Sequence, residues 1–163
     1  MASSAESVPP AFNFSRASVV IIDNNSLCME LLTNILRGFG FRNSHRCATL
    51  ASGTDAVKSN AIDLVLIDPH QHGELGFDFV RWLRSEKRSP SSQASVIIIT
   101  AHTPVRLISA ARQCGADYVI AKPFSITTLL DRILWVAQSE QRRGELMAPT
   151  DLVSSSGSGV ELW

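Results

Sequence analysis

Residues 62–68 read Ile62-Asp63-Leu64-Val65-Leu66-Ile67-Asp68, a largely apolar run that ends in a carboxylate. Three other apolar runs of this type end in Asp23, Thr100 and Lys122. Short apolar runs rich in β-branched residues are typical of strands that are buried on both faces of a parallel sheet. Because the ligand crevice of such a sheet lies outside the carboxyl ends of its strands, we expect two carboxylates, a hydroxyl and an amine to meet there.

The segments between these strands follow helical patterns. After Asp23, two adjacent rows of apolar residues with a spacing of four predict a helix with one buried face. The rows are Leu27, Leu31 and Ile35 beside Cys28, Leu32 and Leu36. Further helices are expected near 53–59, 77–84, 103–114 and 126–136, and a weak strand near 45–49. This alternation predicts an α/β fold in (βα)5 order, with a five-stranded parallel sheet between helices.

The two ends differ in composition from the middle of the chain. Residues 1–16 are rich in Ala, Ser and Pro, and residues 139–163 contain a Ser- and Gly-rich run. Neither end has the periodicity of a packed element, so we expect flexible segments over 1–16 and 139–163 around one folded domain, 17–138. The last residues, which end in Trp163, could instead dock on a partner or on the domain, although a disordered end is favoured.

Composition argues against several classes of function. Fifteen Lys and Arg balance fifteen Asp and Glu, which leaves no basic excess for the phosphates of a nucleic acid, so no nucleic-acid partner is expected. The apolar stretches are far shorter than the roughly twenty residues that span a bilayer, and the first residues lack a signal sequence. We therefore expect a cytoplasmic protein without membrane insertion. The three cysteines are widely spaced and support neither disulfides nor a zinc site.

The residues at the strand ends suit phosphoryl chemistry. Two adjacent carboxylates repel each other unless a hard cation lies between them, and Asp23 and Asp68 could hold Mg²⁺ in this way. Lys122 and Thr100 can bind a carboxylate or phosphoryl oxygen opposite them. Because phosphoryl transfer depends mainly on positioning and charge neutralisation, this set could transfer a phosphoryl group to Asp68 as the nucleophile.

Four motifs carry these residues in order: Val19-Val20-Ile21-Ile22-Asp23-Asn24-Asn25, Leu64-Val65-Leu66-Ile67-Asp68, Ile97-Ile98-Ile99-Thr100-Ala101 and Ala121-Lys122-Pro123-Phe124. In this spacing they resemble the receiver domain of bacterial two-component response regulators, over about residues 17–138. The resemblance implies a flavodoxin-like (βα)5 domain whose Asp68 accepts a phosphoryl group from a histidine kinase or phosphotransfer protein. It also implies that Asp23, Asp68 and the backbone carbonyl of His70 hold Mg²⁺.

The same resemblance implies roles for the other strand-end residues. Lys122 contacts the phosphoryl group, and the peptide bond before Pro123 is commonly cis. Thr100 acts as a switch that follows the phosphoryl group and reorganises the surface around the last two helices, where a downstream protein target binds. Such a domain assists its own phosphorylation and dephosphorylation but is not a conventional enzyme. Because no output region is evident after residue 138, we expect a stand-alone response regulator.

Three positions depart from the family pattern. Asn24 stands where the family usually has a second acidic residue, so we expect a weak or substituted Mg²⁺ ligand and a lower Mg²⁺ affinity. The loop after the acceptor begins with Pro69, whereas the family usually has a proline four residues after the acceptor. The family often has an aromatic residue that accompanies the switch threonine, and at that position this chain has Val119. Tyr118 lies one residue earlier, on the opposite face of the strand.

Three alternatives remain open on the sequence alone. A pseudo-receiver scaffold would keep the fold and bind its partner without phosphorylation, and Asn24 favours it. An aspartyl-phosphate hydrolase would need a second Asp two residues after its nucleophile, and here Asp23 is followed by Asn24 and Asn25. His70 and His72 could bind a softer metal beside the acceptor, but loop histidines are more often solvated.

Overall fold

The computed structural model describes residues 13–69, 75–101 and 105–141. Within these ranges the chain forms a five-stranded parallel sheet in the order β2-β1-β3-β4-β5. The strands are β1 (Ser18–Ile22), β2 (Asn43–Cys47), β3 (Leu64–Ile67), β4 (Ser95–Thr100) and β5 (Tyr118–Ala121). The helices are α1 (Ser26–Phe39), α2 (Leu50–Ser59), α3 (Leu75–Ser85), α4 (Val105–Cys114) and α5 (Ile126–Gln141), with 3-10 helices η1 (Phe14–Arg16) and η3 (Pro90–Gln93). The predicted flavodoxin-like (βα)5 fold is confirmed, although the expected start of the fourth helix near residue 103 lies outside the described ranges.

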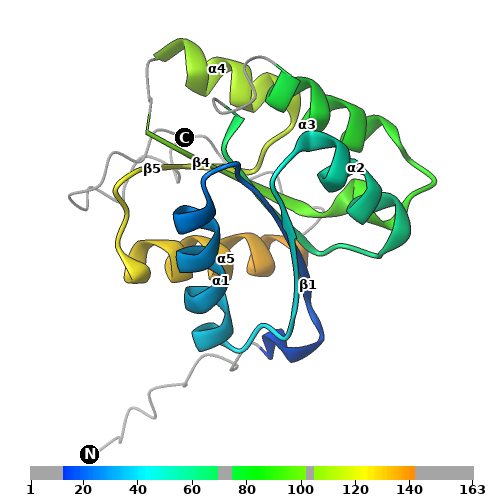
Figure 1. Ribbon diagram of the computed structural model, residues 1–163. Coiled ribbons are helices and arrows are strands. Elements are labelled where there is room, and N and C mark those ends of the chain that lie inside the picture. The colour runs from blue at the N-terminus through cyan, green and yellow to red at the C-terminus, as the bar shows by residue number, and fades with distance from the viewer. Residues whose placement is uncertain (1–12, 70–74, 102–104, 142–163) are drawn as a thin grey trace, which may run out of the picture.

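Helices cover both faces of the sheet (Figure 1). α1 and α5 lie on one face, and α2, α3 and α4 lie on the other. Successive residues of β1 show this division, because Val20 and Ile22 join the core beside α2 and α3, whereas Val19 and Ile21 join the core beside α1 and α5. The central strands are therefore buried on both faces, which explains why their sequences lack an alternation of apolar and polar residues.

The edge strand β2 differs from its expected position. It covers Asn43–Cys47, slightly earlier in the chain than the expected 45–49. The difference arises at Thr49, whose side chain caps α2 by accepting a hydrogen bond from the Ser52 amide at 3.1 Å. As a result, α2 begins earlier than expected, at Leu50. Most of β2 is polar, so no apolar pattern marks its limits in the sequence.

The buried face of α1 also differs from the expected one. Leu27 and Leu31 are 74% and 53% exposed. The buried stripe consists of Met29, Leu32, Thr33 and Leu36. The first turn of α1 closely follows the end of β1, so it lies beyond the carboxyl edge of the sheet, and Leu27 has no strand to cover. The prediction of one broad buried face was therefore wrong for Leu27 and Leu31, whereas Ile35 of the same row packs against the core.

The folded unit extends slightly beyond the predicted limits of residues 17 and 138. Phe14 in η1 is buried and stacks on Phe41, with 4.6 Å between ring centroids and 7° between ring planes. At the other end, α5 continues to Gln141. The remaining parts of the two predicted tails lie outside the described residues. Within the described ranges, no helix combines the length and the apolar character needed to cross a membrane.

Candidate functional site

Asp23 and Asp68 lie beside each other at the carboxyl edge of the sheet. Each follows the last residue of its strand, and these neighbouring strands, β1 and β3, have Ile22 and Ile67 in register. The Asp68 amide donates a hydrogen bond to the Ile22 carbonyl at 3.2 Å, and the Asp23 amide donates one to the Cys47 carbonyl at 3.1 Å. Asp23 and Asp68 are only 2% and 5% exposed. The sheet therefore brings two of the predicted site residues together as a buried pair.

Lys122 joins the two carboxylates. It follows β5, and its amide donates a hydrogen bond to the Thr100 carbonyl at 2.7 Å. Its Nζ lies 3.2 Å from Asp23 Oδ2 and 2.9 Å from Asp68 Oδ2. The lysine side chain is 16% exposed. One ammonium group thus bridges two carboxylates from separate strands, and the ionised cluster keeps an excess of negative charge.

Opposing effects set the pKa of Lys122. Burial by itself would lower this pKa, because it removes water from the ammonium group. The hydrogen bond and the charge of Asp68, together with those of Asp23, act in the opposite direction and raise the pKa of Lys122 above its ordinary value. The lysine is therefore protonated at neutral pH, and its ammonium group donates hydrogen bonds to both carboxylates.

Asp23 also organises the start of α1. Its Oδ1 accepts a hydrogen bond from the Asn25 amide at 2.8 Å. The Asn25 side chain in turn caps α1 by accepting hydrogen bonds from the amides of Leu27 and Cys28 at 3.0 and 3.1 Å. Asn24, which lies between Asp23 and the capping residue, is exposed. These contacts fix the orientation of Asp23 while its Oδ2 contacts the lysine of the site.

The oxygen donors of the site fit a hard cation such as Mg²⁺. Mg²⁺ prefers oxygen ligands and usually keeps several waters, so one or two carboxylates suffice as protein ligands. Asp23 and Asp68 provide these groups, although the described residues contain no cluster of three or more His, Cys, Asp or Glu suited to a metal ion. The backbone carbonyl of His70, a predicted third ligand, lies outside the described residues. The alternative site for a softer metal, with His70 and His72, lies there too.

Thr100, the predicted switch residue, ends β4 and is fully buried. Ile98 of the same strand belongs to the core beside α3 and α4, and the alternation of strand side chains places Thr100 on that face. Tyr118 belongs to the core on the other face. Its ring centroid lies 5.5 Å from that of Trp135 and 4.7 Å from the Arg132 guanidinium. The structure therefore agrees with the expectation that Tyr118 faces away from the switch threonine.

A close backbone contact holds the chain directly after Asp68. Pro69 is buried, and a Cβ atom at Gly76 of α3 would lie only 2.5 Å from Pro69 Cα. A larger residue at position 76 would therefore press against the backbone beside Asp68. The unusual proline after Asp68 was visible in the sequence, but its partner could not be predicted without the packing of α3.

An apolar hollow borders the site. It has a volume of about 390 Å³ and is lined by Cys28, Leu31, Leu32, Ala101, Lys122, Pro123 and Phe124. Leu27 precedes Leu31 by one helical turn, so the apolar surface of α1 continues beyond the hollow. We call the residues Leu27, Leu31, Pro123 and Phe124 the apolar rim. The Lys122–Pro123 peptide bond is cis, as the resemblance implied. Sequence reasoning missed this rim because it predicted that both leucines were buried.

A parallel (βα)5 sheet with two aspartates, a threonine and a lysine at its carboxyl edge defines a receiver of the response regulator class. The family model described as "Response regulator receiver domain" matches residues 19–134. The chain therefore belongs to the response regulator receiver domain family, as the sequence predicted. Receiver domains are signalling domains that interact with histidine kinases and downstream targets, and they typically bind Mg²⁺ at the phosphorylation site.

Known proteins similar to this chain include whole receivers and longer regulators. The "DNA-binding response regulator MtrA" of Mycolicibacterium paratuberculosis is 32% identical over 121 residues, covering 72% of this chain and 50% of the relative. The "Chemotaxis protein CheY-3" of Vibrio cholerae is 27% identical over 115 residues, covering 71% of this chain and 87% of the relative. A solved response regulator from Thermotoga maritima has a TM-score of 0.66 at 25% identity, covering 74% of this chain and 96% of that one. The chain spans about half the length of the MtrA relatives that it matches.

Proposed function

We propose that this protein accepts a phosphoryl group on Asp68 from a histidine kinase or phosphotransfer protein and passes the signal on through changed protein contacts. The observation that carries the proposal is the position of Lys122 Nζ, 2.9 Å from Asp68 and 3.2 Å from Asp23. Two carboxylates and an ammonium group thus lie close together at the carboxyl edge of the sheet, which supports Asp68 as the nucleophile and Asp23 as a ligand of the cation. Membership in the receiver family supports the same role.

In the proposed transfer, Asp68 attacks the phosphorus atom of a phosphohistidine. A bond forms between a carboxylate oxygen of Asp68 and phosphorus, while the P–N bond breaks and its electron pair returns to the imidazole nitrogen. Lys122 then donates hydrogen bonds to the new phosphoryl oxygens and to Asp23. Hydrolysis of the acyl phosphate by water restores the carboxylate and releases inorganic phosphate.

The charge balance of the site supports a role for Mg²⁺. One ammonium group for two carboxylates leaves excess negative charge, which repels an incoming phosphoryl group. The carboxylates of Asp23 and Asp68 would hold Mg²⁺, with the backbone carbonyl of His70 as a further ligand. The bound cation supplies the positive charge that offsets this repulsion. Asn24 contributes a neutral amide instead of a carboxylate, so Mg²⁺ binding is weakened but retained.

The apolar rim suits the docking of a phosphohistidine donor. A donor must bring its imidazole to Asp68 and must therefore cover the surface around Lys122. Among the described residues, that surface includes the apolar hollow, whose lining contains the half-exposed Leu31. Burial of apolar side chains is the main favourable term in most protein associations. The rim therefore fits the apolar stripe of an amphipathic helix that carries the histidine.

The response to phosphorylation begins at Thr100. Its hydroxyl, buried at the end of β4, moves toward the phosphoryl oxygens and changes the packing of α4, β5 and α5. Tyr118 takes no direct part, because it is held on the opposite face by Trp135 and Arg132. A downstream protein that binds this face would distinguish the two states.

Gel electrophoresis with a phosphate-binding matrix tests the first step. We expect wild-type protein incubated with acetyl phosphate and Mg²⁺ to give a retarded band. Asp68→Asn should give none, whereas Asp55→Asn, which changes an exposed carboxylate on α2, should behave like the wild type. No retarded band in the wild type, or an equal one in Asp68→Asn, contradicts the proposal.

A second candidate function is a pseudo-receiver scaffold that binds its partner without phosphorylation. Asn24 favours it, because the missing carboxylate lowers the affinity for the cation that transfer needs. Partner binding that is equal in the wild type, Asp68→Asn and Asp68→Glu would select this alternative. Phosphorylation-dependent binding that is lost in Asp68→Asn would exclude it.

A further inference from the structure

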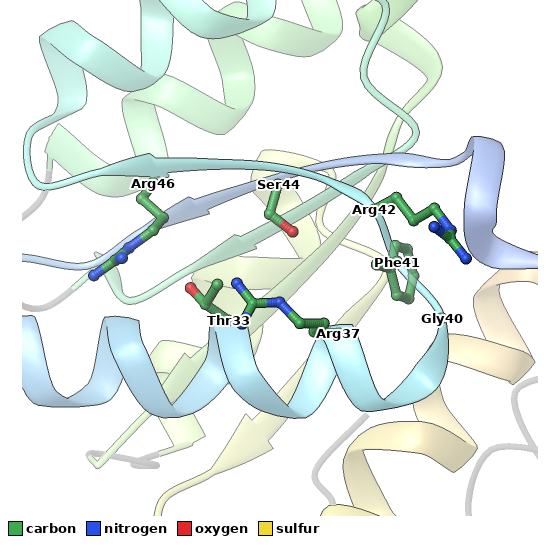
Figure 2. A pocket seen from close by; sticks show the side chains of 7 residues that line it. All are labelled: Thr33, Arg37, Gly40, Phe41, Arg42, Ser44 and Arg46. Carbon is green, nitrogen blue, oxygen red and sulfur yellow. The ribbon is translucent and has the colours of Figure 1, made fainter.

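A second hollow lies between α1 and the edge strand β2, away from the aspartate and lysine site (Figure 2). It has a volume of about 590 Å³. Its lining consists of Thr33, Arg37, Gly40, Phe41, Arg42, Ser44 and Arg46. Three of these residues are arginines and none is acidic. The volume falls in the range of sites that bind small molecules.

The hollow exists because β2 presents polar side chains where its neighbour presents apolar ones. Ser44 and Arg46 are in register with Val19 and Ile21 of β1. Both β1 residues belong to the core beside α1, so Ser44 and Arg46 face the same helix. In Figure 2 both side chains point from β2 toward α1. A serine and a long cationic side chain leave space there that a packed apolar pair would fill.

In the described part of the chain, the three arginines of the hollow are not paired with acidic side chains. Within the described ranges, no carboxylate forms an ion pair with Arg37, Arg42 or Arg46. All three arginines are exposed. Figure 2 shows the Arg37 side chain along α1 toward Thr33, while Arg42 lies past Phe41 at the other end. In this view Arg37 lies between Arg46 at one end of the hollow and Arg42 at the other, so that arginine side chains follow its whole length.

We propose that this hollow binds a small phosphorylated compound that carries two or more negative charges. Guanidinium groups match the geometry of phosphate oxygens and form paired charge-assisted hydrogen bonds with them. The Ser44 hydroxyl provides a further donor beside Arg46. Two arginines and a hydroxyl around one concave space thus suit a diphosphate or polyphosphate group, held against the edge of the sheet.

A nucleic-acid strand fits this site less well. Proteins that hold single strands stack the bases on exposed aromatic rings. The one aromatic residue of the lining, Phe41, is 3% exposed and is already stacked on Phe14. The balanced charge of the chain also gives no extended basic surface for a duplex. The geometry therefore favours recognition of the phosphate groups of a small ligand.

Isothermal titration with inorganic pyrophosphate tests this proposal. Wild-type protein without Mg²⁺ keeps the acceptor site out of the measurement, because its two carboxylates for one ammonium group repel an anion. We expect saturable binding with one site. Arg37→Gln and Arg46→Gln should each weaken it about tenfold or more, because each removes a charge-assisted contact. Arg88→Gln, which changes an exposed arginine between α3 and η3, should leave it unchanged.

Two further measurements separate the possible outcomes. Circular dichroism establishes that each variant is folded, and amide chemical shifts of Ser44 and Arg46 should move on addition of pyrophosphate. The proposal is overturned if pyrophosphate fails to bind at millimolar concentration, or if Arg37→Gln and Arg46→Gln bind as well as Arg88→Gln. Binding of a single-stranded oligonucleotide that pyrophosphate does not displace would also overturn it.

Discussion

The ammonium of Lys122 lies 2.9 Å from the carboxylate of Asp68, although 54 residues separate the two in the chain. The same ammonium lies 3.2 Å from Asp23. The side chains of Asp23, Asp68 and Lys122 follow three different strands and form one electrostatic cluster. In this cluster a single ammonium group is the counter-charge of both carboxylates. This cluster links the stability of the fold to the chemistry proposed for the site.

Removal of this cation should destabilise the protein. In Lys122→Met two buried carboxylates lose their counter-charge, and we expect the free energy of unfolding at pH 7 to fall by about 1–3 kcal/mol in urea denaturation. Asp68→Asn is the matched control, because it leaves one carboxylate for one ammonium, and it should cost much less. Equal stability of Lys122→Met and the wild type would contradict the account.

The pH dependence of this contribution has a definite sign. Folding raises the pKa of Lys122, so its stabilising contribution is fully present below the unfolded pKa of about 10.4 and is lost as the pH rises through the folded pKa. Above neutral pH, the difference in stability between the wild type and Lys122→Met should therefore persist until the solution is strongly alkaline.

Restoring a carboxylate at position 24 should strengthen Mg²⁺ binding. Asn24→Asp adds a negative charge beside Asp23, and we expect the Mg²⁺ affinity measured by calorimetry to rise on the order of tenfold. Asn34→Asp adds the same charge at an exposed position of α1 and should have little effect. An unchanged affinity in Asn24→Asp would show that the asparagine does not limit cation binding.

A charge on the apolar rim should slow phosphoryl transfer from a protein donor but not from a small-molecule donor. Leu31→Glu places a carboxylate on the surface proposed to receive the phosphohistidine donor, so transfer from a phosphotransfer protein should slow by about tenfold or more. The rate with acetyl phosphate should stay close to that of the wild type, because Asp68 is intact. Ala51→Glu, at an exposed position of α2, is the charge control. Equal slowing with both donors would point to damage of the site and not to lost docking.

Two glycine substitutions should have opposite effects on stability. A Cβ at Gly76 would meet Pro69 Cα at 2.5 Å, whereas one at Gly38 of α1 would meet nothing within 4 Å. We expect Gly76→Ala to destabilise the fold by about 1–3 kcal/mol and Gly38→Ala to stabilise it by about 0.5–1 kcal/mol. Thermal unfolding of the two variants measures both. If Gly76→Ala leaves the stability unchanged, the backbone after Asp68 adjusts to the added Cβ at no cost, and this prediction is wrong.

The central part of the fold could be predicted from the sequence because its strands are buried on both faces. The run Leu64–Ile67 has no other plausible environment, and the polar residue that follows each such run marks the carboxyl edge of the sheet. The edge strand β2 was placed less well, since an exposed strand needs no apolar pattern. Phe14 was also missed, because its partner Phe41 is distant in the chain and no local period connects them.

The positions of Asp23, Asp68, Thr100 and Lys122 at the carboxyl edge of the sheet followed from the same strand-end rule. The apolar rim did not, because a helical pattern shows which residues of α1 share a face but not how far the helix extends past the sheet. The hollow beside Arg37 and Arg46 could not be predicted from the sequence either. It depends on the register of β2 against β1, which a polar strand does not reveal.

The central claim is that Asp68 itself carries the phosphoryl group. Borohydride reduces an aspartyl phosphate to homoserine, so reduction followed by peptide mass spectrometry identifies the modified residue. After incubation with acetyl phosphate and Mg²⁺, the account predicts homoserine at position 68 and at no other aspartate, and none in a sample without donor. Homoserine at a different aspartate, or phosphorylated protein without homoserine at position 68, would contradict it.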